Sequence, residues 1–170
     1  MAKASSSQTV KKVAVKKAVK ETVKKVAVAR PKKEPTIKYA DKSAGQPELI
    51  PIFEAIKKMI LPYENKRSLK ILAKTYGQIN LISHKPVEIE GKKRDEFWFV
   101  SVLIQKGYVG FYNNPFYLKG ETAKAFSPGF AKCLKGKGCF HIKTLDPVIM
   151  KDIKKAIQTG YDEYVKTGIL

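Results

Sequence analysis

The amino-acid composition changes abruptly near residue 44, and this change limits which part of the chain can fold. Residues 1–44 contain no Leu, Phe, Trp or Cys, and Tyr39 is the only aromatic residue among them. Their apolar side chains are almost all Val and Ala, which offer too little apolar area to offset the conformational entropy that is lost on folding. We therefore expect residues 1–44 to be a disordered Lys/Val/Ala-rich tail and linker, and residues 45–170 to form one globular domain.

Positive charge dominates both parts of the chain. The 170 residues include 34 Lys and Arg against 15 Asp and Glu, a net charge of +19. Residues 1–44 hold 13 of the basic and 3 of the acidic residues (+10), which leaves 21 and 12 (+9) for residues 45–170. This excess favours polyanionic partners, above all nucleic acid. The tail lacks the Trp, Phe and Leu side chains that insert into a bilayer, and no apolar run is long enough to span one, so no membrane partner is expected.

The tail contains a short repeat, because the sequence VKKVAV of residues 10–15 recurs at residues 23–28. In composition the tail resembles the Lys-Ala-Val tails of linker-histone-like bacterial proteins. Lysines that contact phosphates neutralise them and release condensed counterions. Such contacts do not distinguish one base sequence from another. The alternative is a solubilising tail without a dedicated partner. The lysines that we predict to contact the phosphate backbone are Lys11, Lys12, Lys16, Lys17, Lys20, Lys24 and Lys25.

Residues 45–170 carry the periodicities of an α+β domain. Apolar residues at steps of three and four predict helices over residues 47–61 and 147–166. Between them, β-branched and aromatic runs separated by Gly and polar residues predict about five or six strands. These strands are expected at residues 68–75, 79–83, 87–90, 97–104, 108–112 and 139–142, with a polar turn at 91–93. Short connections imply an antiparallel sheet with both helices on one face, a two-layer sandwich.

Two short blocks of this domain resemble the YdhG-like family, a domain of unknown function. They are GYVGFY at residues 107–112 and KGKGCFHI at residues 135–142, the latter followed by Leu145-Asp146-Pro147 and the closing helix. The resemblance covers about residues 47–168 and implies a frataxin-like fold of helix, sheet and helix. One branch of the family is described as bacterial iron chaperones, which supply iron for cluster and haem assembly.

An iron chaperone is therefore one alternative function, with iron as the possible cofactor. Frataxins bind iron through acidic side chains on the first helix and first strand. The corresponding helix here also carries Lys57 and Lys58, and the strand region is basic, which would repel iron cations. The candidate ligands under this alternative are Glu48, Glu54, Glu64 and His141.

A second group of residues combines aromatic rings with lysines after the 108–112 strand. Exposed rings could stack on bases or on another flat ligand, whereas buried rings would belong to the core. The candidate ligand patch consists of Tyr112, Phe116, Tyr117, Lys135 and Lys137. Cys133, Cys139 and His141 form a possible metal-ligand set, but five residues separate the two cysteines, whereas zinc sites commonly place two to four between them.

No catalytic motif is present: the chain has no G-x-S-x-G, H-E-x-x-H or G-x-G-x-x-G sequence. We therefore expect a non-enzymatic protein. Two cysteines and no evident secretory signal indicate a reducing, cytoplasmic location. Besides nucleic-acid association and iron delivery, small-molecule binding remains open, and it would require a pocket beside the sheet.

Overall fold

The structure, a computed structural model, describes residues 42–89, 91–118 and 125–170, and leaves out the side chains of residues 73–75, 117 and 118. The longer helices are α1 (Ile50–Ile60) and α4 (Pro147–Lys166). Short 3-10 turns, η1 (Pro47–Leu49) and η2 (Leu61–Tyr63), flank α1, so the predicted helix over 47–61 is divided into three pieces. Two further short helices are α2 (Asn114–Leu118) and α3 (Pro128–Cys133).

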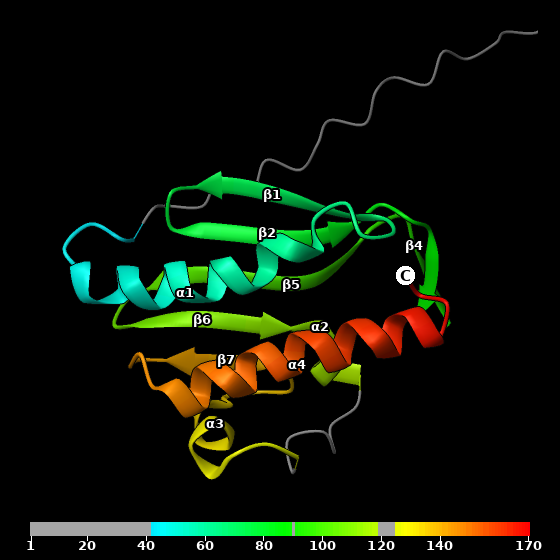
Figure 1. Cartoon of the computed structure of the whole chain (residues 1–170). Helices are drawn as coiled ribbons and strands as arrows, with labels where there is room; N and C mark the ends of the chain where they lie inside the picture. The colour runs from blue at the N-terminus through cyan, green and yellow to red at the C-terminus, as the bar shows by residue number, and fades with distance from the viewer. Residues whose placement is uncertain (1–41, 90, 119–124) are drawn as a thin grey trace, which may run out of the picture. The chain divides into compact units, whose positions relative to one another are not determined.

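Five strands form one antiparallel sheet in the order β1-β2-β5-β6-β7. They are β1 (Leu69–Thr75), β2 (Gln78–Ser83), β5 (Phe97–Gln105), β6 (Tyr108–Asn113) and β7 (Cys139–Ile142). Both long helices lie against one face of this sheet (Figure 1). The predicted α+β arrangement, an N-terminal helix, an antiparallel sheet and a C-terminal helix, is therefore confirmed.

The predicted polar turn at residues 91–93 is wrong in part. Lys92–Arg94 form a strand, β4, which pairs with β3 (Val87–Ile89) in a separate two-stranded sheet. All three residues of β4 are exposed, so the strand has no hydrophobic alternation that sequence reading could detect. The tight connection between β3 and β4, and not the burial of β4 side chains, sets the pairing of these two strands.

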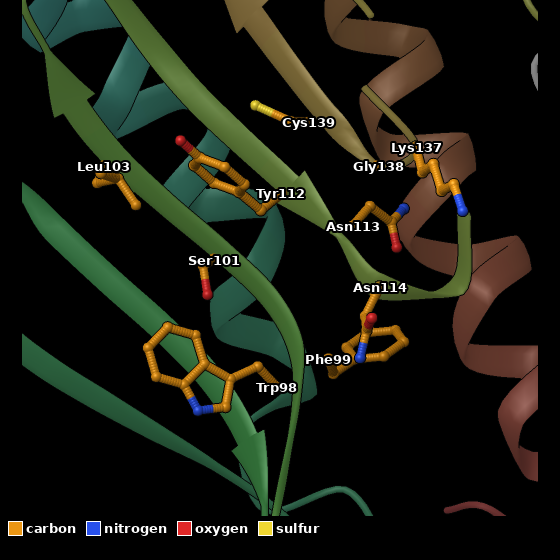
Figure 2. Close-up of a pocket in the computed structure, with 10 residues that line it drawn as sticks. All are labelled: Trp98, Phe99, Ser101, Leu103, Tyr112, Asn113, Asn114, Lys137, Gly138 and Cys139. Atoms are coloured by element: carbon orange, nitrogen blue, oxygen red, sulfur yellow. The ribbon is translucent and has the colours of Figure 1, made fainter. Parts of the chain in front are cut away.

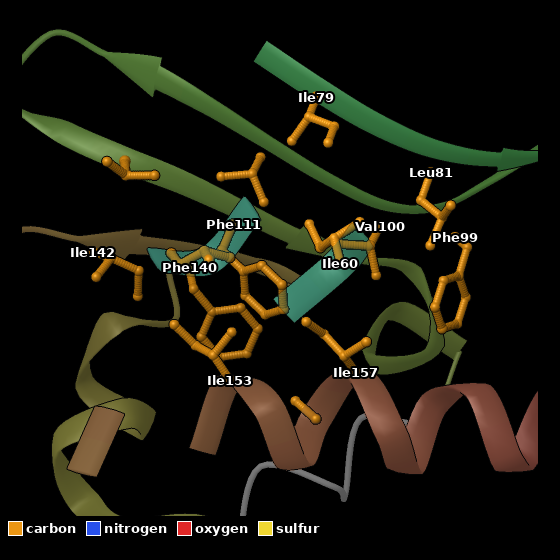
Figure 3. Close-up of a cluster of buried hydrophobic side chains, with 14 of the residues drawn as sticks. Ile60, Ile79, Leu81, Phe99, Val100, Phe111, Phe140, Ile142, Ile153 and Ile157 are labelled. Atoms are coloured by element: carbon orange, nitrogen blue, oxygen red, sulfur yellow. The ribbon is translucent and has the colours of Figure 1, made fainter. Parts of the chain in front are cut away.

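The hydrophobic core fills the space between the sheet and the two long helices (Figure 3). Alternate residues of β6 and β7 and one side of each long helix enter it, as the periodicity predicts. Aromatic rings dominate its β7 end, where Phe130 and Phe140 stack with ring centroids 4.3 Å apart. Phe116 packs edge-on against Phe140, with centroids 5.3 Å apart. The short helices α2 and α3 are thus held by the same core as the sheet.

Local capping explains where α4 begins. One carboxylate oxygen of Asp146, Oδ1, accepts hydrogen bonds from the backbone N–H groups of Val148 (2.7 Å) and Ile149 (3.1 Å). Pro147 follows in the first helical position, where its missing N–H costs nothing. The sequence Asp146-Pro147 therefore fixes the predicted start of this helix.

The described chain already contacts the domain at Lys42, three residues before the predicted boundary. The Lys42 side chain donates a hydrogen bond to Gln105, the last residue of β5. Gln46 accepts one from the backbone N–H of Gly107, in the β5–β6 turn. Residues 1–41, and hence the predicted disorder of the tail, lie outside the described residues. Within the described ranges, no helix is both long and apolar enough to cross a membrane.

Candidate functional site

The sheet has a second face that carries neither long helix, and we call it the open face (Figure 1). Strand alternation assigns residues to the two faces. In β7, Phe140 and Ile142 are buried in the core, so Cys139 and His141 point to the open face. In β6, Val109 and Phe111 are core residues, so Tyr108, Gly110 and Tyr112 share that open face. Both strands therefore alternate regularly between the core and the open face.

Strand β5 contains an irregularity that changes its alternation. Ile82 of β2 pairs with Trp98, whereas Leu81 pairs with Val100, so Phe99 is an extra residue in β5. Such a bulge places two consecutive side chains on the same face of the sheet. Phe99 and Val100 are both core residues. As a result, Trp98, Ser101 and Leu103 occupy the open face.

A groove with a volume of about 440 Å³ lies on the open face across β5, β6 and β7. This volume is within the range of small-ligand sites in proteins. Figure 2 shows its side chains, which come from three neighbouring strands, from the start of α2 and from the loop before β7. The residues that line this open-face groove are Trp98, Phe99, Ser101, Leu103, Tyr112, Asn113, Asn114, Lys137, Gly138 and Cys139.

Two aromatic rings, Trp98 and Tyr112, give the groove its apolar character. The Trp98 side chain keeps 38% of its surface exposed although the ring is large and apolar. Ser101, the cross-strand partner of Tyr112, lies between the two rings (Figure 2). The Ser101 side chain is small and only 4% exposed, so it forms part of the groove floor between two aromatic neighbours.

The aromatic surface continues on the other side of Gly110. Tyr108 stacks on His141 with ring centroids 3.7 Å apart and an interplanar angle of 13°. Burial lowers the pKa of His141 below its ordinary value of 6.5, and the nearby charges of Lys135 and Lys143 lower it further. His141 is therefore predominantly neutral at neutral pH, which suits a stacked ring better than a charged one.

Positive charge surrounds this aromatic surface. Lys137 lines the groove itself, and Lys135 and Lys143 act on His141 at its margin. The sequences of β5, β6 and β7 contain neither Asp nor Glu. The nearest carboxylates in sequence are Asp95 and Glu96, just before β5, and one Glu96 oxygen lies 3.6 Å from a ring nitrogen of His84. The groove thus combines rings with cations.

The structure brings together only part of the predicted ligand patch. Tyr112 and Lys137 both line the groove, whereas Lys135 does not line it, although its charge acts on His141. Phe116 is a correction: its side chain is only 4% exposed and belongs to the aromatic core, so it offers no surface for a ligand. Tyr117 lies in α2, and its side chain is outside the described part of the chain.

The candidate iron ligands are not gathered at one place. Glu54 forms an ion pair with Lys57 at 3.1 Å on α1, against the helix-bearing face of the sheet, whereas His141 points to the open face. Glu48 and Glu64 are exposed in the segments that flank α1. Among the described residues, no three His, Cys, Asp or Glu side chains form a group that could hold a metal ion.

The two cysteines are free thiols in different environments. Cys139 lines the groove, and Cys133, in α3, donates a hydrogen bond through its sulfur to the carbonyl oxygen of Gly129 (3.4 Å). Burial raises the pKa of the Cys133 thiol, which disfavours the thiolate that metal binding and nucleophilic attack require. The predicted phosphate-binding lysines, Lys11 to Lys25, lie outside the described residues.

Sequence reasoning missed most of the groove residues, among them Trp98, Ser101 and Leu103 of β5. The 97–104 segment was correctly predicted as a strand, but counting alternate residues from Phe97 places Ser101 and Leu103 on the core side. The usable signal was the position of Trp98, a large ring next to the acidic turn Asp95-Glu96. The bulge at Phe99 depends on pairing with β2, which the local sequence does not encode.

No protein-family model, curated protein or solved structure matches this chain. The resemblance to the YdhG-like family therefore stays a prediction.

Proposed function

We propose that this protein is a non-enzymatic nucleic-acid-binding protein that contacts the phosphate backbone without base-sequence preference. The observation that carries the proposal is the positive excess in both parts of the chain, +10 in residues 1–44 and +9 in residues 45–170. Each lysine that neutralises a phosphate releases a condensed cation, and this release favours binding to any sequence.

The distribution of charge on the domain also supports the proposal. Among the described residues, Lys137 is the cationic side chain that lines the groove, and the charges of Lys135 and Lys143 act on His141 of β7. A polyanion held by the tail lysines would therefore meet a basic surface, and no carboxylate of β5, β6 or β7 would repel it.

The test is a salt series with labelled duplex DNA and the full chain, measured by fluorescence anisotropy. We expect the logarithm of the affinity to fall linearly with the logarithm of salt concentration, with a slope of about −0.9 for each phosphate contact. Replacing Lys11, Lys12, Lys16, Lys17, Lys20, Lys24 and Lys25 by Gln should weaken binding and make the slope shallower.

The matched control replaces the same seven lysines by Arg, which keeps the charge. This variant should bind with the affinity and the salt slope of the original chain. If the Gln variant binds as tightly as the Arg variant, the tail has no role in binding. If the original chain fails to bind DNA even at low salt, the proposed function is wrong.

The open-face groove favours a second candidate, binding of a small flat anionic molecule. The small-molecule alternative requires a pocket beside the sheet, and the groove of about 440 Å³ meets that requirement. A screen of aromatic carboxylates and phosphates by thermal unfolding of the full chain tests it. A ligand of this kind should raise the melting temperature, and this increase should disappear when Tyr112 is replaced by Leu.

A further inference from the structure

We propose that the open-face groove binds unstacked bases of single-stranded nucleic acid, with Trp98 and Tyr112 as the stacking side chains. This inference rests on the proposed function, because the tail is taken to supply the phosphate contacts. It adds a second mode of contact, in which the folded domain recognises the bases and so distinguishes single strands from duplexes.

Aromatic rings of two neighbouring strands line the groove together. Trp98 on β5 and Tyr112 on β6 both line the groove, and Ser101, whose side chain is small, lies between them (Figure 2). Bases stack on aromatic side chains in this way in proteins that bind single strands on a sheet surface. The Tyr108–His141 stack extends the same aromatic surface beyond Gly110, so a second base has a place to lie.

The charge of the groove complements that of a nucleic acid. A base brings its phosphate with it, and Lys137 lies in the groove wall, at the end formed by Asn113, Asn114 and Gly138 (Figure 2). Lys135 and Lys143 add positive charge near His141, along the extension of the groove. Strands β5, β6 and β7 contribute no carboxylate that would repel the phosphate.

The same charges argue against the most obvious other occupant, the tail of this chain. Residues 1–44 carry a net charge of +10, so Lys137 and its neighbours would repel the tail. The described chain nevertheless starts close to the groove, because Lys42 contacts Gln105, which is two residues beyond Leu103 on the same face of β5. The first described residues are thus attached to the end of β5 beside Leu103 of the groove.

Single strands are the form that fits this groove. In a duplex each base is covered above and below by its neighbours, so its faces cannot reach a protein ring without unstacking. In a single strand the bases can turn outward and stack on Trp98 or Tyr112. The groove thus predicts a preference for single strands, which phosphate contacts alone would not give.

The chain contains one tryptophan, so its fluorescence reports the groove directly. The full chain is titrated with an oligothymidylate and, separately, with an abasic oligomer of equal length and charge, while anisotropy of a label on the oligomer measures binding. We expect the oligothymidylate to quench Trp98 by stacking and the abasic oligomer to bind without quenching it.

The outcomes separate the two proposals. Binding of both oligomers with equal quenching, or with none, overturns the base-binding groove but leaves the phosphate-binding tail intact. Absence of binding by either oligomer at low salt overturns both. A free nucleotide is included in the titrations: if it quenches Trp98 as strongly as the oligothymidylate at equal concentration, the groove is a site for small nucleotides and the inference fails.

A pair of variants gives an independent test. Tyr112→Leu should weaken oligothymidylate binding about tenfold, and leave the affinity for the abasic oligomer unchanged. The control is Tyr76→Leu, because Tyr76 is 68% exposed and does not line the groove. Thermal unfolding of both variants checks that they are folded. The role of Tyr112 would be contradicted if Tyr112→Leu lowered the affinity for both oligomers equally. It would also be contradicted if Tyr76→Leu lowered the affinity for oligothymidylate as much as Tyr112→Leu does.

Discussion

The ring of Tyr112 occupies the space that a side chain at Gly110 would need. A Cβ atom placed at Gly110 would lie 2.7 Å from Cε2 of Tyr112 and 3.2 Å from its hydroxyl oxygen. The two residues are two apart on β6 and share the open face, so the missing side chain of one sets the position of the other. Glycine is therefore the residue that lets the Tyr112 ring lie along its own strand.

Replacing Gly110 by Ala should move the Tyr112 ring while leaving the fold intact, because the ring is the far end of a side chain that can rotate. We expect the affinity for oligothymidylate to fall several-fold, with the affinity for an abasic oligomer unchanged. The control is Gly136→Ala, whose new Cβ would meet the Cβ of Cys139 at an ordinary distance of 4.0 Å. Equal affinities in the two variants would show that the ring position does not matter for binding.

Gly160 in α4 also lies in close contact with another residue, and the direction in which Gly160→Ala changes the stability tests that contact. An added Cβ would lie 2.7 Å and 2.9 Å from two ring carbons of Pro115. Ala normally gains about 1 kcal/mol over Gly in a helix, but forcing an atom into a packed contact costs about 1–3 kcal/mol. Gly160→Ala should therefore lower the midpoint of urea unfolding, whereas Thr159→Ala, at an exposed position of the same helix, should leave it equal or raise it. A higher midpoint for Gly160→Ala would contradict the contact.

The start of α4 makes a prediction about stability. Asp146→Ala removes the acceptor of two backbone hydrogen bonds and should lower the free energy of unfolding by about 1 kcal/mol. Asp146→Asn keeps an acceptor oxygen in the same place, so it should lower the free energy of unfolding much less. Thermal unfolding of the two variants compares them, and equal losses would mean that the charge, not the cap, stabilises the helix.

The lowered pKa of His141 gives a pH dependence with a definite sign. In the unfolded chain the imidazole binds a proton more readily than in the folded domain, so protonation favours unfolding. The contribution of His141 to stability is complete above pH 6.5 and is lost as the pH falls from there towards its pKa in the folded domain.

Two measurements check this dependence. The chain has two histidines, so its NMR titration contains two imidazole signals, and His141→Gln identifies which one belongs to His141. Urea unfolding at about pH 7.5 and about pH 5.5 should show a smaller loss of stability for His141→Gln than for the original chain. The opposite order would mean that protonation stabilises the folded domain.

The iron-chaperone alternative is tested by calorimetry. Because the described residues offer no group of three acidic, His or Cys side chains, we expect anaerobic addition of Fe²⁺ to the full chain to release no saturable heat at micromolar metal. If such heat appears, Glu48→Gln, Glu54→Gln and Glu64→Gln will show whether the acidic residues around α1 are the ligands, as the family resemblance implies.

The elements with strong local signals were predictable from the sequence. The C-terminal helix spans Pro147–Lys166, the range that its capping residues and apolar periodicity predict, and β7 begins and ends as predicted. These signals act between residues that are close in the sequence, so they do not depend on how the rest of the domain packs. The helix-sheet-helix order followed from them and from the short connections between strands.

The site was less predictable because it depends on contacts between distant segments. The bulge at Phe99 arises from pairing with β2 and moves Ser101 and Leu103 to the open face. Phe116 is buried because Phe126, Phe130 and Phe140 surround it, and these contacts join residues up to 24 positions apart. A sequence shows that a ring exists, but only the packed domain shows which side of the sheet it faces.

The contact between Lys42 and Gln105 also affects how strongly the two proposed binding sites, the tail lysines and the open-face groove, can act together. It fixes the first described residue to the end of β5, so a polymer bound by the tail, as we propose, would be tethered to the domain from this point. The second encounter is then intramolecular, and its probability is set by an effective concentration instead of the bulk one. Lengthening the connection just before Lys42 with a flexible Gly-Ser insert should lower that effective concentration and reduce the avidity for long polymers, while short oligomers that reach only one site bind as before.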